Sequence, residues 1–410
     1  MDLKRIAFKY ESPAIFTKKK GYHHIFLKKA NGVYFWDTEG KKYLDMTSFF
    51  GVMNFGHSPD FILNEIKRMK NTLIHGLGDI FSNIYRVLLA EKICKMIKGD
   101  YQAIILNTGS EVCEIAIKTA YLYTKKEYVI SFENSYHGLT GFSLSLTDRF
   151  QKNFFIPFVY KKIKRLSFPE DEAKAEKTLD KVKRLIKRFP VSSIILEPIQ
   201  ARGGINLPPF PFIKELASIC KREDIILIFD EIFTGLGRTG KMFAYEWFDV
   251  KPDIICIGKG IASGFPLSIC AGKKDMMNAW KNKEEETLHA STFAGHPLSS
   301  FIAIKFLEKL EKFDLKKEVI EKGDYILNYL KDLKEKYGVL KKIKGKGLLI
   351  GIETDLAKEI WKELLFKQRI LTLLEGKELN TIALTPPFVI TYSQIDEFFN
   401  KFEKVLRKKL

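Results

Sequence analysis

Short runs of consecutive apolar residues alternate with amphipathic stretches through the middle of the chain. The runs that predict strands are residues 103–107, 128–132, 193–197, 225–229, 253–258 and 268–272. Between them, stretches such as residues 111–124 repeat apolar positions at steps of three and four, which predicts helices. Strands that are apolar on both faces are typical of a parallel sheet covered by helices. The pattern therefore predicts an α/β fold, with a large three-layer αβα domain around a mostly parallel sheet.

The two ends of the chain follow a different pattern. Residues 31–45 alternate apolar and polar positions around a central turn, which predicts a hairpin. Residues 347–354, 369–374 and 381–387 read as short strands before a final helix. We expect these ends to combine into a smaller α+β domain. The predicted limits are 1–55 for the N-terminal segment, 56–305 for the large domain and 306–410 for the C-terminal part of the small domain.

Composition supports a globular protein with a sizeable core. The chain has 410 residues, of which 46% are hydrophobic, and this length allows two or three domains. No apolar run approaches the roughly 18 residues that a membrane span needs. The first ten residues are charged throughout and lack the apolar core of a signal peptide. We therefore expect a cytoplasmic protein without a membrane partner.

Five cysteines are spread along the chain without a CxxC pair, in apolar surroundings. This pattern favours buried thiols over disulfides or metal ligands. The formal net charge is +18, and lysines gather at residues 18–20, 161–165 and 341–346. Such charge is compatible with nucleic-acid binding. The clusters are scattered and no stacking aromatic series accompanies them, so we expect a solvated lysine-rich surface and no nucleic-acid partner.

Candidate chemistry begins where the run 225–229 ends on Asp230, followed by a glycine-rich loop. Ligands of open α/β sheets bind beyond the carboxyl ends of strands, which places Asp230 beside a ligand. A carboxylate there could bind a metal, a ribose or a protonated ring nitrogen. Because no His or Cys cluster accompanies it in the sequence, no metal site is predicted. The alternative is an aspartate that caps a helix or a turn.

A second strand end carries a lysine. Lys259 follows the run 253–258 and lies between Gly258 and Gly260. A lysine that ends a buried strand among small residues is poorly solvated, which disfavours the ammonium form and supplies a neutral amine nucleophile. The alternative is an ordinary lysine in a surface turn.

Two further strand ends offer a phosphate cradle and a flat aromatic. Gly109 and Ser110 close one strand and open a helix, where free N–H groups attract anions. An ordinary helix cap by Ser110 or Thr108 is the alternative. Tyr136 follows the run 128–132 and could lie flat on a planar cofactor, or it could be a core or turn aromatic.

The four sites together indicate a ligand with a phosphate, an aromatic ring that contains a basic nitrogen, and an aldehyde for a lysine. Pyridoxal 5'-phosphate has all three features. A lysine that forms a Schiff base and an acidic partner for the ring nitrogen are what this cofactor requires. The sequence therefore predicts a pyridoxal-phosphate site.

At this point the chain resembles the class III (omega-) aminotransferases of pyridoxal-phosphate fold type I, over nearly its whole length. The segments that carry the resemblance include YFWDTEGKKYLD, TGSEVCEIAIK, SYHG, ILEPIQARGGI, DEIFTGLGRTGKMFA, KPDIICIGKGIASGFPL, HASTFAGHPL and TPPFVIT. The resemblance implies that Lys259 forms the Schiff base and later moves a proton, and that Asp230 pairs with the ring nitrogen. It also implies a homodimer with shared active sites, in which Thr292 reaches the phosphate of the neighbouring subunit.

Other cofactor contacts are likewise implied by the resemblance. Gly109 and Ser110 would hold the phosphate. Tyr136 would stack on one face of the ring, and Ile232 would pack on the other. Glu197 would lie near the cofactor and tune the surroundings of the carboxylate that pairs with the ring nitrogen.

Several positions depart from the family pattern and bear on the substrate. Leu139 and Ala383 stand where members that act on acetylornithine or 4-aminobutyrate usually carry arginines that grip carboxylates. Phe233 replaces a frequent glutamine, and His296, where relatives often have asparagine, is expected to be structural. Arg202 replaces an acid seen in many relatives. We hypothesise that it supplies the missing grip on a substrate carboxylate, the alternative being a solvated arginine.

The sequence predicts an aminotransferase that moves an amino group from an amine or an (omega-)amino acid to a 2-oxo acid by a ping-pong mechanism. An amino-acid racemase, epimerase or aminomutase on the same scaffold is the alternative, because those reactions need the same lysine. A basic binding protein without catalysis is a more remote alternative. The intact lysine, aspartate and phosphate cradle argue against it.

Overall fold

The computed structural model describes residues 2–12, 14, 25–69, 72–78, 80–282 and 287–409. Its largest sheet has the strand order β4-β10-β9-β8-β7-β5-β6. These strands are β4 (Tyr101–Leu106), β5 (Tyr128–Phe132), β6 (Ile163–Leu166), β7 (Val191–Leu196), β8 (Ile226–Asp230), β9 (Ile254–Ile257) and β10 (Ser268–Lys273). Strand β10 is antiparallel to both of its neighbours, and the other pairs are parallel. The carboxyl ends of all strands but β10 therefore meet at one edge.

Helices cover both faces of this sheet. Along β8, Leu227 and Phe229 belong to an apolar cluster with helices α8 (Phe210–Arg222) and α10 (Pro297–Glu311). Ile226 and Ile228 belong to a second cluster with helix α5 (Gly109–Thr124). Successive side chains of a strand point to opposite faces, so each face has its own core. The predicted three-layer αβα arrangement is confirmed.

The remaining helices are α1 (Leu3–Tyr10), α2 (Ser48–Gly51), α3 (Asp60–Arg68), α4 (Ile84–Ile97), α6 (Gly141–Leu146), α7 (Glu172–Arg188), α9 (Lys274–Met277), α11 (Lys322–Tyr337), α12 (Ala357–Phe366) and α13 (Tyr392–Leu406). Short 3₁₀ segments include η2 (Phe150–Phe158) and η4 (Lys259–Ala262). No helix among the described residues is long and apolar enough to cross a bilayer.

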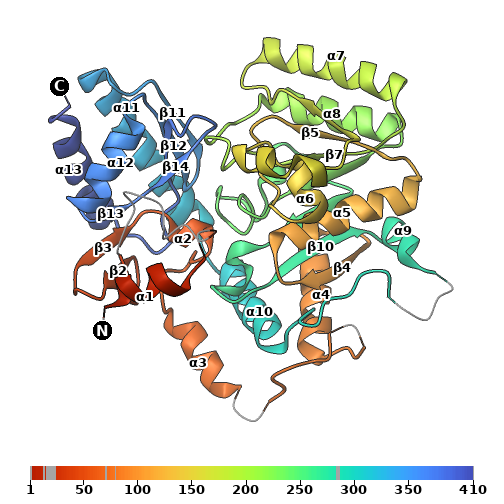
Figure 1. Ribbon diagram of the computed structural model, residues 1–410, viewed down its shortest axis with the longest axis horizontal. Coiled ribbons are helices and arrows are strands. Elements are labelled where there is room, and N and C mark those ends of the chain that lie inside the picture. The colour runs from red at the N-terminus through yellow and green to blue at the C-terminus, as the bar shows by residue number, and fades with distance from the viewer. Residues whose placement is uncertain are drawn as a thin grey trace.

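Two smaller sheets join the ends of the chain. One has the order β1-β2-β3-β13 and the other β11-β12-β15-β14. Their strands are β1 (Leu27–Asn31), β2 (Tyr34–Asp37), β3 (Lys42–Asp45), β11 (Lys342–Lys346), β12 (Leu349–Glu353), β13 (Ile370–Leu371), β14 (Leu373–Glu375) and β15 (Thr381–Leu384). Figure 1 shows the red N-terminal strands beside the blue C-terminal segment, and β3 pairs with β13 in parallel. The predicted α+β part built from both termini is thus confirmed, whereas the exact domain limits stay a prediction.

Two lysine clusters expected only as solvated surface also form strands. Residues 161–165 overlap β6 and residues 341–346 overlap β11, and each of these strands lies at the edge of its sheet. Charged side chains at an edge discourage pairing with another chain, which accounts for lysine in a strand. The cluster at residues 18–20 lies outside the described residues.

All five cysteines are free thiols. Four of them are buried, as predicted, and Cys94 is partly exposed.

Arg238 fixes the glycine-rich loop after β8 to segments from both ends of the chain. Its guanidinium donates to the carbonyl oxygens of Leu348 and Pro386 at 3.2 and 2.6 Å. It also donates to Ser48 Oγ at 3.2 Å and to Asn54 Oδ1 at 2.6 Å. Burial lowers the pKa of Arg238 to about 9. The loop that follows Asp230 is therefore held in place by side-chain and backbone groups of the N- and C-terminal segments.

Candidate active site

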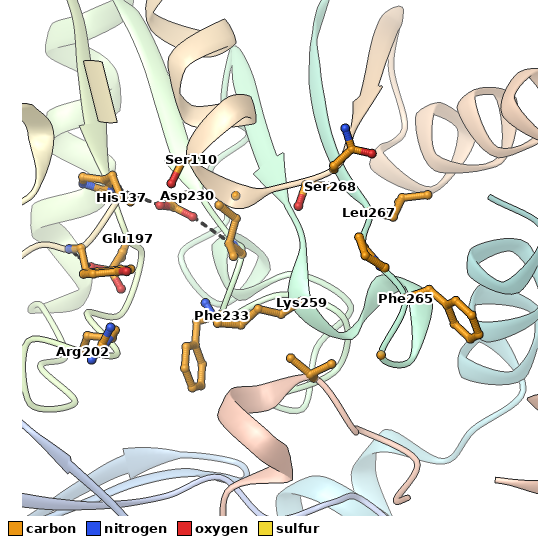
Figure 2. A pocket seen from close by; sticks show the side chains of 18 residues that line it. Ser110, His137, Glu197, Arg202, Asp230, Phe233, Lys259, Phe265, Leu267 and Ser268 are labelled. Atoms are coloured by element: carbon orange, nitrogen blue, oxygen red, sulfur yellow. Dashed lines mark hydrogen bonds and ion pairs between the residues drawn. The ribbon is translucent and has the colours of Figure 1, made fainter. Parts of the chain in front are cut away.

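The carboxyl ends of the parallel strands open onto a cavity of about 350 Å³. Figure 2 shows how side chains from separate strand ends converge on it. The residues predicted from the sequence that line it are Gly109, Ser110, Tyr136, Glu197, Arg202, Asp230, Ile232 and Lys259. Thr292, the remaining predicted residue, is exposed and is not among the lining residues. One site thus gathers residues that are far apart in the sequence, and their individual roles stay predictions.

Asp230 is the last residue of β8, and its side chain points to the same face as Ile228, toward α5. Its Oδ2 receives a hydrogen bond from Cys113 Sγ at 3.5 Å and lies 2.7 Å from His137 Nδ1. Its Oδ1 accepts the N–H of Ile232 at 3.0 Å. The carboxylate is 3% exposed. It is thus fixed in one orientation, with both oxygens bonded to donors of the protein.

His137 is the charged neighbour of this carboxylate. Burial opposes a charge on the imidazole, but hydrogen bonds with Asp230 and Cys113 outweigh it and raise the pKa of His137 to about 10. Cys113, His137 and Asp230 bring three potential metal ligands within 4.8 Å of one another, which the sequence did not indicate. The hydrogen bond between His137 and Asp230 makes this imidazole a proton-bearing partner for the carboxylate.

Lys259 begins η4 directly beyond β9, with φ +48°. A non-glycine residue in this left-handed region is strained, and such strain is frequent at functional positions. Its Nζ lies 4.6 Å from the centre of the Phe233 ring. Burial lowers the pKa of Lys259, Asp230 opposes that shift, and Arg202 adds to it. A lysine with a lowered pKa is more often neutral, and the neutral amine is the nucleophile.

The first turn of α5 lies at the cavity, which Gly109 and Ser110 line. Thr108 caps the helix, because its Oγ1 accepts the N–H of Glu111 at 3.3 Å while Glu111 accepts the N–H of Thr108 at 2.7 Å. Ser110 lies in this turn beside Gly138, which has φ +122°. A Cβ at Gly138 would lie 2.2 Å from Ser110 Oγ, so only glycine fits there. The turn is a ready anion site.

Tyr136, Glu197 and Ile232 shape the same cavity. Glu197 accepts the N–H of Tyr136 at 3.1 Å and the N–H of Ala201 at 3.0 Å, so it ties two loops together. Burial raises the pKa of Glu197 to about 7. A Cβ at Gly109 would lie 2.9 Å from Ile232 Cδ1, which shows that Ile232 packs against the start of α5. Tyr136 and Ile232 therefore give the cavity an aromatic and an aliphatic wall.

Arg202 belongs to a charged group that the sequence did not reveal. Its guanidinium carbon lies 4.4 Å from the centre of the Tyr136 ring, and its Nε lies 3.4 Å from Glu375 Oε1. Arg149 Nη1 lies 3.4 Å from the other oxygen of Glu375. Glu375 ends β14, 173 residues away from Arg202. No local pattern connects residues that far apart, so only the fold could bring them together.

The departures from the family pattern occupy distinct places. Leu139 is 38% exposed, whereas Ala383 is buried in an apolar cluster with Phe233 and Leu373. His296 Nδ1 accepts the N–H of Ser299 at 3.3 Å and caps α10, which agrees with the structural role expected of it.

The donor set fits pyridoxal phosphate. An anion-binding helix start, a fixed carboxylate and a lysine of lowered pKa face one cavity between Tyr136 and Ile232. A phosphate, a protonated ring nitrogen and an aldehyde are the groups that these residues would hold. The geometry alone supports chemistry at a carbon that bears an amino group.

The whole chain is similar to known proteins. Residues 15–406 match the model of the family described as aminotransferase class-III. The chain is 32% identical over 391 residues to the acetylornithine aminotransferase of Methanocaldococcus jannaschii, covering 93% of each chain. It is 34% identical over 404 residues to the ornithine aminotransferase of Halalkalibacterium halodurans, covering 95% of this chain and 96% of the relative.

Solved structures with the same fold also match. An aminotransferase of Bacillus anthracis has a TM-score of 0.92 at 26% identity, covering 99% of this chain and 98% of that chain. The ornithine aminotransferase of Toxoplasma gondii, which holds pyridoxal phosphate at partial occupancy in its active site, has a TM-score of 0.87 at 26% identity. It covers 99% of this chain and 94% of that chain.

Proposed function

Because this chain belongs to the class III aminotransferases, we propose that Lys259 and Asp230 are the catalytic residues of its pyridoxal-phosphate site. The enzyme transfers an amino group to a 2-oxo acid, using pyridoxal phosphate as its cofactor. The observation that carries the assignment of residues is that Lys259 and Asp230 face one cavity from the ends of β9 and β8. The two residues have separate tasks in the mechanism.

When bound, pyridoxal phosphate accepts the electron pair left on the substrate carbon after that carbon loses a proton. Asp230 would hold the proton on the ring nitrogen, which would keep the ring electron-poor. His137, whose Nδ1 lies 2.7 Å from Oδ2, holds this carboxylate in place. Lys259 would hold the cofactor through its aldehyde. As a free amine, Lys259 Nζ would take the proton from the substrate carbon as a base and pass it to the cofactor as an acid.

Other residues bind and orient. We assign the phosphate to Gly109, Ser110 and the N–H groups of the first turn of α5, with Gly138 leaving room for the serine hydroxyl. Tyr136 and Ile232 would pack against the two faces of the ring. Glu197 holds the loop of Tyr136 through its N–H.

Arg202 is our candidate for binding a substrate carboxylate. Leu139 and Ala383 stand in place of the expected arginines. Among the described residues that line the cavity, Arg202 is the arginine that could bind a carboxylate. We expect Arg202→Ala to raise KM for a 2-oxo acid by about tenfold, the equivalent of about 1.4 kcal/mol, while kcat changes little. Arg222→Ala, at an exposed surface position, is the matched control. An unchanged KM in the Arg202 variant would show that the carboxylate binds elsewhere.

We also propose a homodimer that shares its active sites. An exposed apolar strip runs along residues 73–88 and contains Leu73, Ile74, Leu77, Ile80, Phe81, Ile84, Val87 and Leu88. Phe293, next to Thr292, is 57% exposed, and its ring lies 5.5 Å from that of His75 at the strip. Such an apolar surface is typical of an interface. A second copy seated on it is the arrangement in which Thr292 could reach the partner's phosphate.

Separate half-reactions test the assignment of Lys259. 4-Aminobutyrate, alanine and ornithine are added one at a time to the cofactor-loaded protein. An amino donor that reacts should change the absorbance of the cofactor and release one carbonyl product. Pyruvate or 2-oxoglutarate should reverse the change. In Lys259→Ala we expect the half-reaction to slow by about 10²–10⁴-fold, since its base is missing. Conversion at the parental rate in that variant would contradict the role of Lys259.

A further inference from the structure

Glu375 is a buried carboxylate shared by two arginines at the rim of the cavity. Its side chain is 3% exposed. Arg202 Nε lies 3.4 Å from Oε1, and Arg149 Nη1 lies 3.4 Å from Oε2. Arg149 is itself 6% exposed, whereas Arg202 is 24% exposed and lines the cavity. Of the two arginines, Arg202 therefore faces the cavity.

Arg202 uses the inner part of its guanidinium for Glu375. Both contacts with that carboxylate go through Nε, and within the described part of the chain no hydrogen-bond acceptor meets its two terminal nitrogens. The guanidinium carbon lies 4.4 Å from the centre of the Tyr136 ring and 5.8 Å from that of Phe50. A planar fork with unused donors is the geometry that binds a carboxylate through two parallel hydrogen bonds.

Arg149 contacts both the backbone of Arg202 and the side chain of Glu375. Its Nη1 donates to the carbonyl oxygen of Arg202 at 2.6 Å, and the N–H of Gly376 donates to that oxygen at 3.1 Å. Two guanidinium groups face one carboxylate, so the group carries one net positive charge. Burial lowers the pKa of Arg149 and raises the pKa of Glu375, which shows how costly either charge would be without the other. The excess charge is exposed only at Arg202.

We propose that Arg149 is a positioning residue that holds Glu375, so that the terminal nitrogens of Arg202 stay free for a carboxylate of the amino-acid or oxo-acid substrate. This inference rests on the proposed role of Arg202. When Arg202 binds the substrate carboxylate, Glu375 keeps Arg149 as a cationic partner. The buried carboxylate of Glu375 therefore does not become an unpaired charge. Without Arg149, Arg202 is the ion-pair partner that remains to Glu375 in the described part of the chain, and the oxygens of Glu375 then compete with the substrate for Arg202.

Substitutions of Arg149 and Glu375 should therefore have opposite effects on carboxylate binding, and these effects should cancel in the double variant. Removing Arg149 weakens carboxylate binding, because Glu375 then draws the guanidinium of Arg202 away from the cavity. Removing the charge of Glu375 as well leaves Arg202 free again. A merely structural Arg149 would behave differently, since a second substitution in the same buried group would add to the damage.

Binding of propionate and of its uncharged amide, propionamide, to the cofactor-loaded protein tests this. The readout is the dissociation constant from the perturbed cofactor absorbance, with thermal melting as a check on folding. For Arg149→Met we expect the constant for propionate to rise about tenfold and that for propionamide to stay unchanged. For the double variant Arg149→Met/Glu375→Gln we expect recovery to near the parental value. Glu375→Gln alone should bind propionate at least as tightly as the parent.

The outcomes separate the two levels of the proposal. If Arg202→Ala leaves propionate binding unchanged, the proposed role of Arg202 itself is wrong. If Arg202 matters but the double variant binds propionate as poorly as Arg149→Met, Arg149 does not act through Glu375. Should Arg149→Met be too unstable to measure, the double variant is compared with Glu375→Gln, and a large difference between them overturns the inference. Arg222→Met is the matched surface control.

Discussion

At the scale of single residues, the adjacent acids Asp230 and Glu231 lie in different environments. Asp230 points toward α5 and the cavity, where His137 supplies a positive charge. Glu231 is fully buried and accepts hydrogen bonds from Thr234 Oγ1 and from the N–H of Tyr245. Burial without a cationic partner raises the pKa of Glu231 to about 7. Two adjacent acids thus lie in different environments, and only Asp230 has the proposed role in chemistry.

The raised pKa of Glu231 makes stability depend on pH. Between about pH 4.5 and 7 the folded state keeps the proton on this carboxyl, while the unfolded chain releases it. Its contribution is therefore complete below about pH 4.5 and is lost as the pH rises through about 7. We expect the free energy of unfolding to fall over this window, by up to about 1.4 kcal/mol per pH unit from one such group.

Urea denaturation at pH 5, 6 and 7 measures this slope. Glu231→Gln carries no titrating proton, so its stability should fall less steeply with pH than that of the parent, whatever its absolute stability. Glu215→Gln, at an exposed position, should keep the parental slope. Parallel slopes for Glu231→Gln and the parent would contradict a raised pKa at this carboxyl.

Eight of the eighteen residues that line the cavity were predicted from the sequence, and those found from the strand pattern follow a strand and carry a group with distinct chemistry. Lys259, Asp230 and Ser110 are examples. Glu375 and Arg149 could not be found in this way. Glu375 lies at the end of a three-residue strand whose position depends on how the C-terminal segment packs against the large sheet. The contact between Cys113 and Asp230 was equally hidden, because an apolar helix position gives no indication of its neighbour.

At the scale of elements, the first turn of α5 joins helix stability to anion binding. Thr108 caps α5 through a reciprocal pair of hydrogen bonds with Glu111. Thr391 caps α13 in the same way with Gln394, far along the chain. Both threonines are exposed. The two caps are therefore matched in geometry and differ in what lies next to them.

We expect Thr108→Ala and Thr391→Ala to lower the free energy of unfolding by similar amounts, about 1 kcal/mol each. Only Thr108→Ala should also weaken the binding of pyridoxal phosphate, because it loosens the turn that carries Ser110. Equilibrium titration of each apoprotein with the cofactor measures this difference. Equal cofactor affinities in the two variants would argue against a phosphate site at the start of α5.

Elements were predicted well where hydrophobic periodicity is strong, and poorly where charge interrupts it. The buried strands β5, β7, β8 and β9 are runs of apolar residues, since both faces of the sheet are covered. Strands β6 and β11 carry lysine and arginine side chains and lie at sheet edges, where one side remains in water. An edge strand obtains much of its order from its neighbour, so its own sequence is a weak guide.

At the scale of the whole molecule, the apolar strip at residues 73–88 predicts self-association. We expect the protein to sediment with twice the mass of one chain. Ile84→Asp, in the middle of that strip and 67% exposed, should give monomers because it buries a charge in an apolar interface. Phe366→Asp, at a 44% exposed position on α12, is the control and should stay dimeric.

The cofactor affinity of the monomeric variant tests whether the two subunits share their active sites. If Thr292 contributes to the partner's phosphate site, Ile84→Asp should bind pyridoxal phosphate more weakly than Phe366→Asp. In the dimeric background, Thr292→Ala should weaken binding without changing the sedimentation. A monomeric parent, or a Thr292 variant with parental affinity, would contradict shared sites.

The architecture as a whole followed from the alternation of strands and helices, but the contact between β3 and β13 did not. That parallel pair joins residues more than 300 positions apart and links both ends of the chain in one sheet. Long-range pairing depends on the packed core, so no window of sequence indicates it.

Every proposed role at this site depends on the bond between Lys259 and the cofactor. The most direct measurement is borohydride reduction of the protein loaded with pyridoxal phosphate, followed by proteolysis and mass spectrometry of the tagged peptide. We predict a single stable pyridoxyl tag on Lys259, with loss of the cofactor's visible absorbance. A tag on another lysine, or protein that takes up the cofactor but carries no tag after reduction, would contradict the central claim.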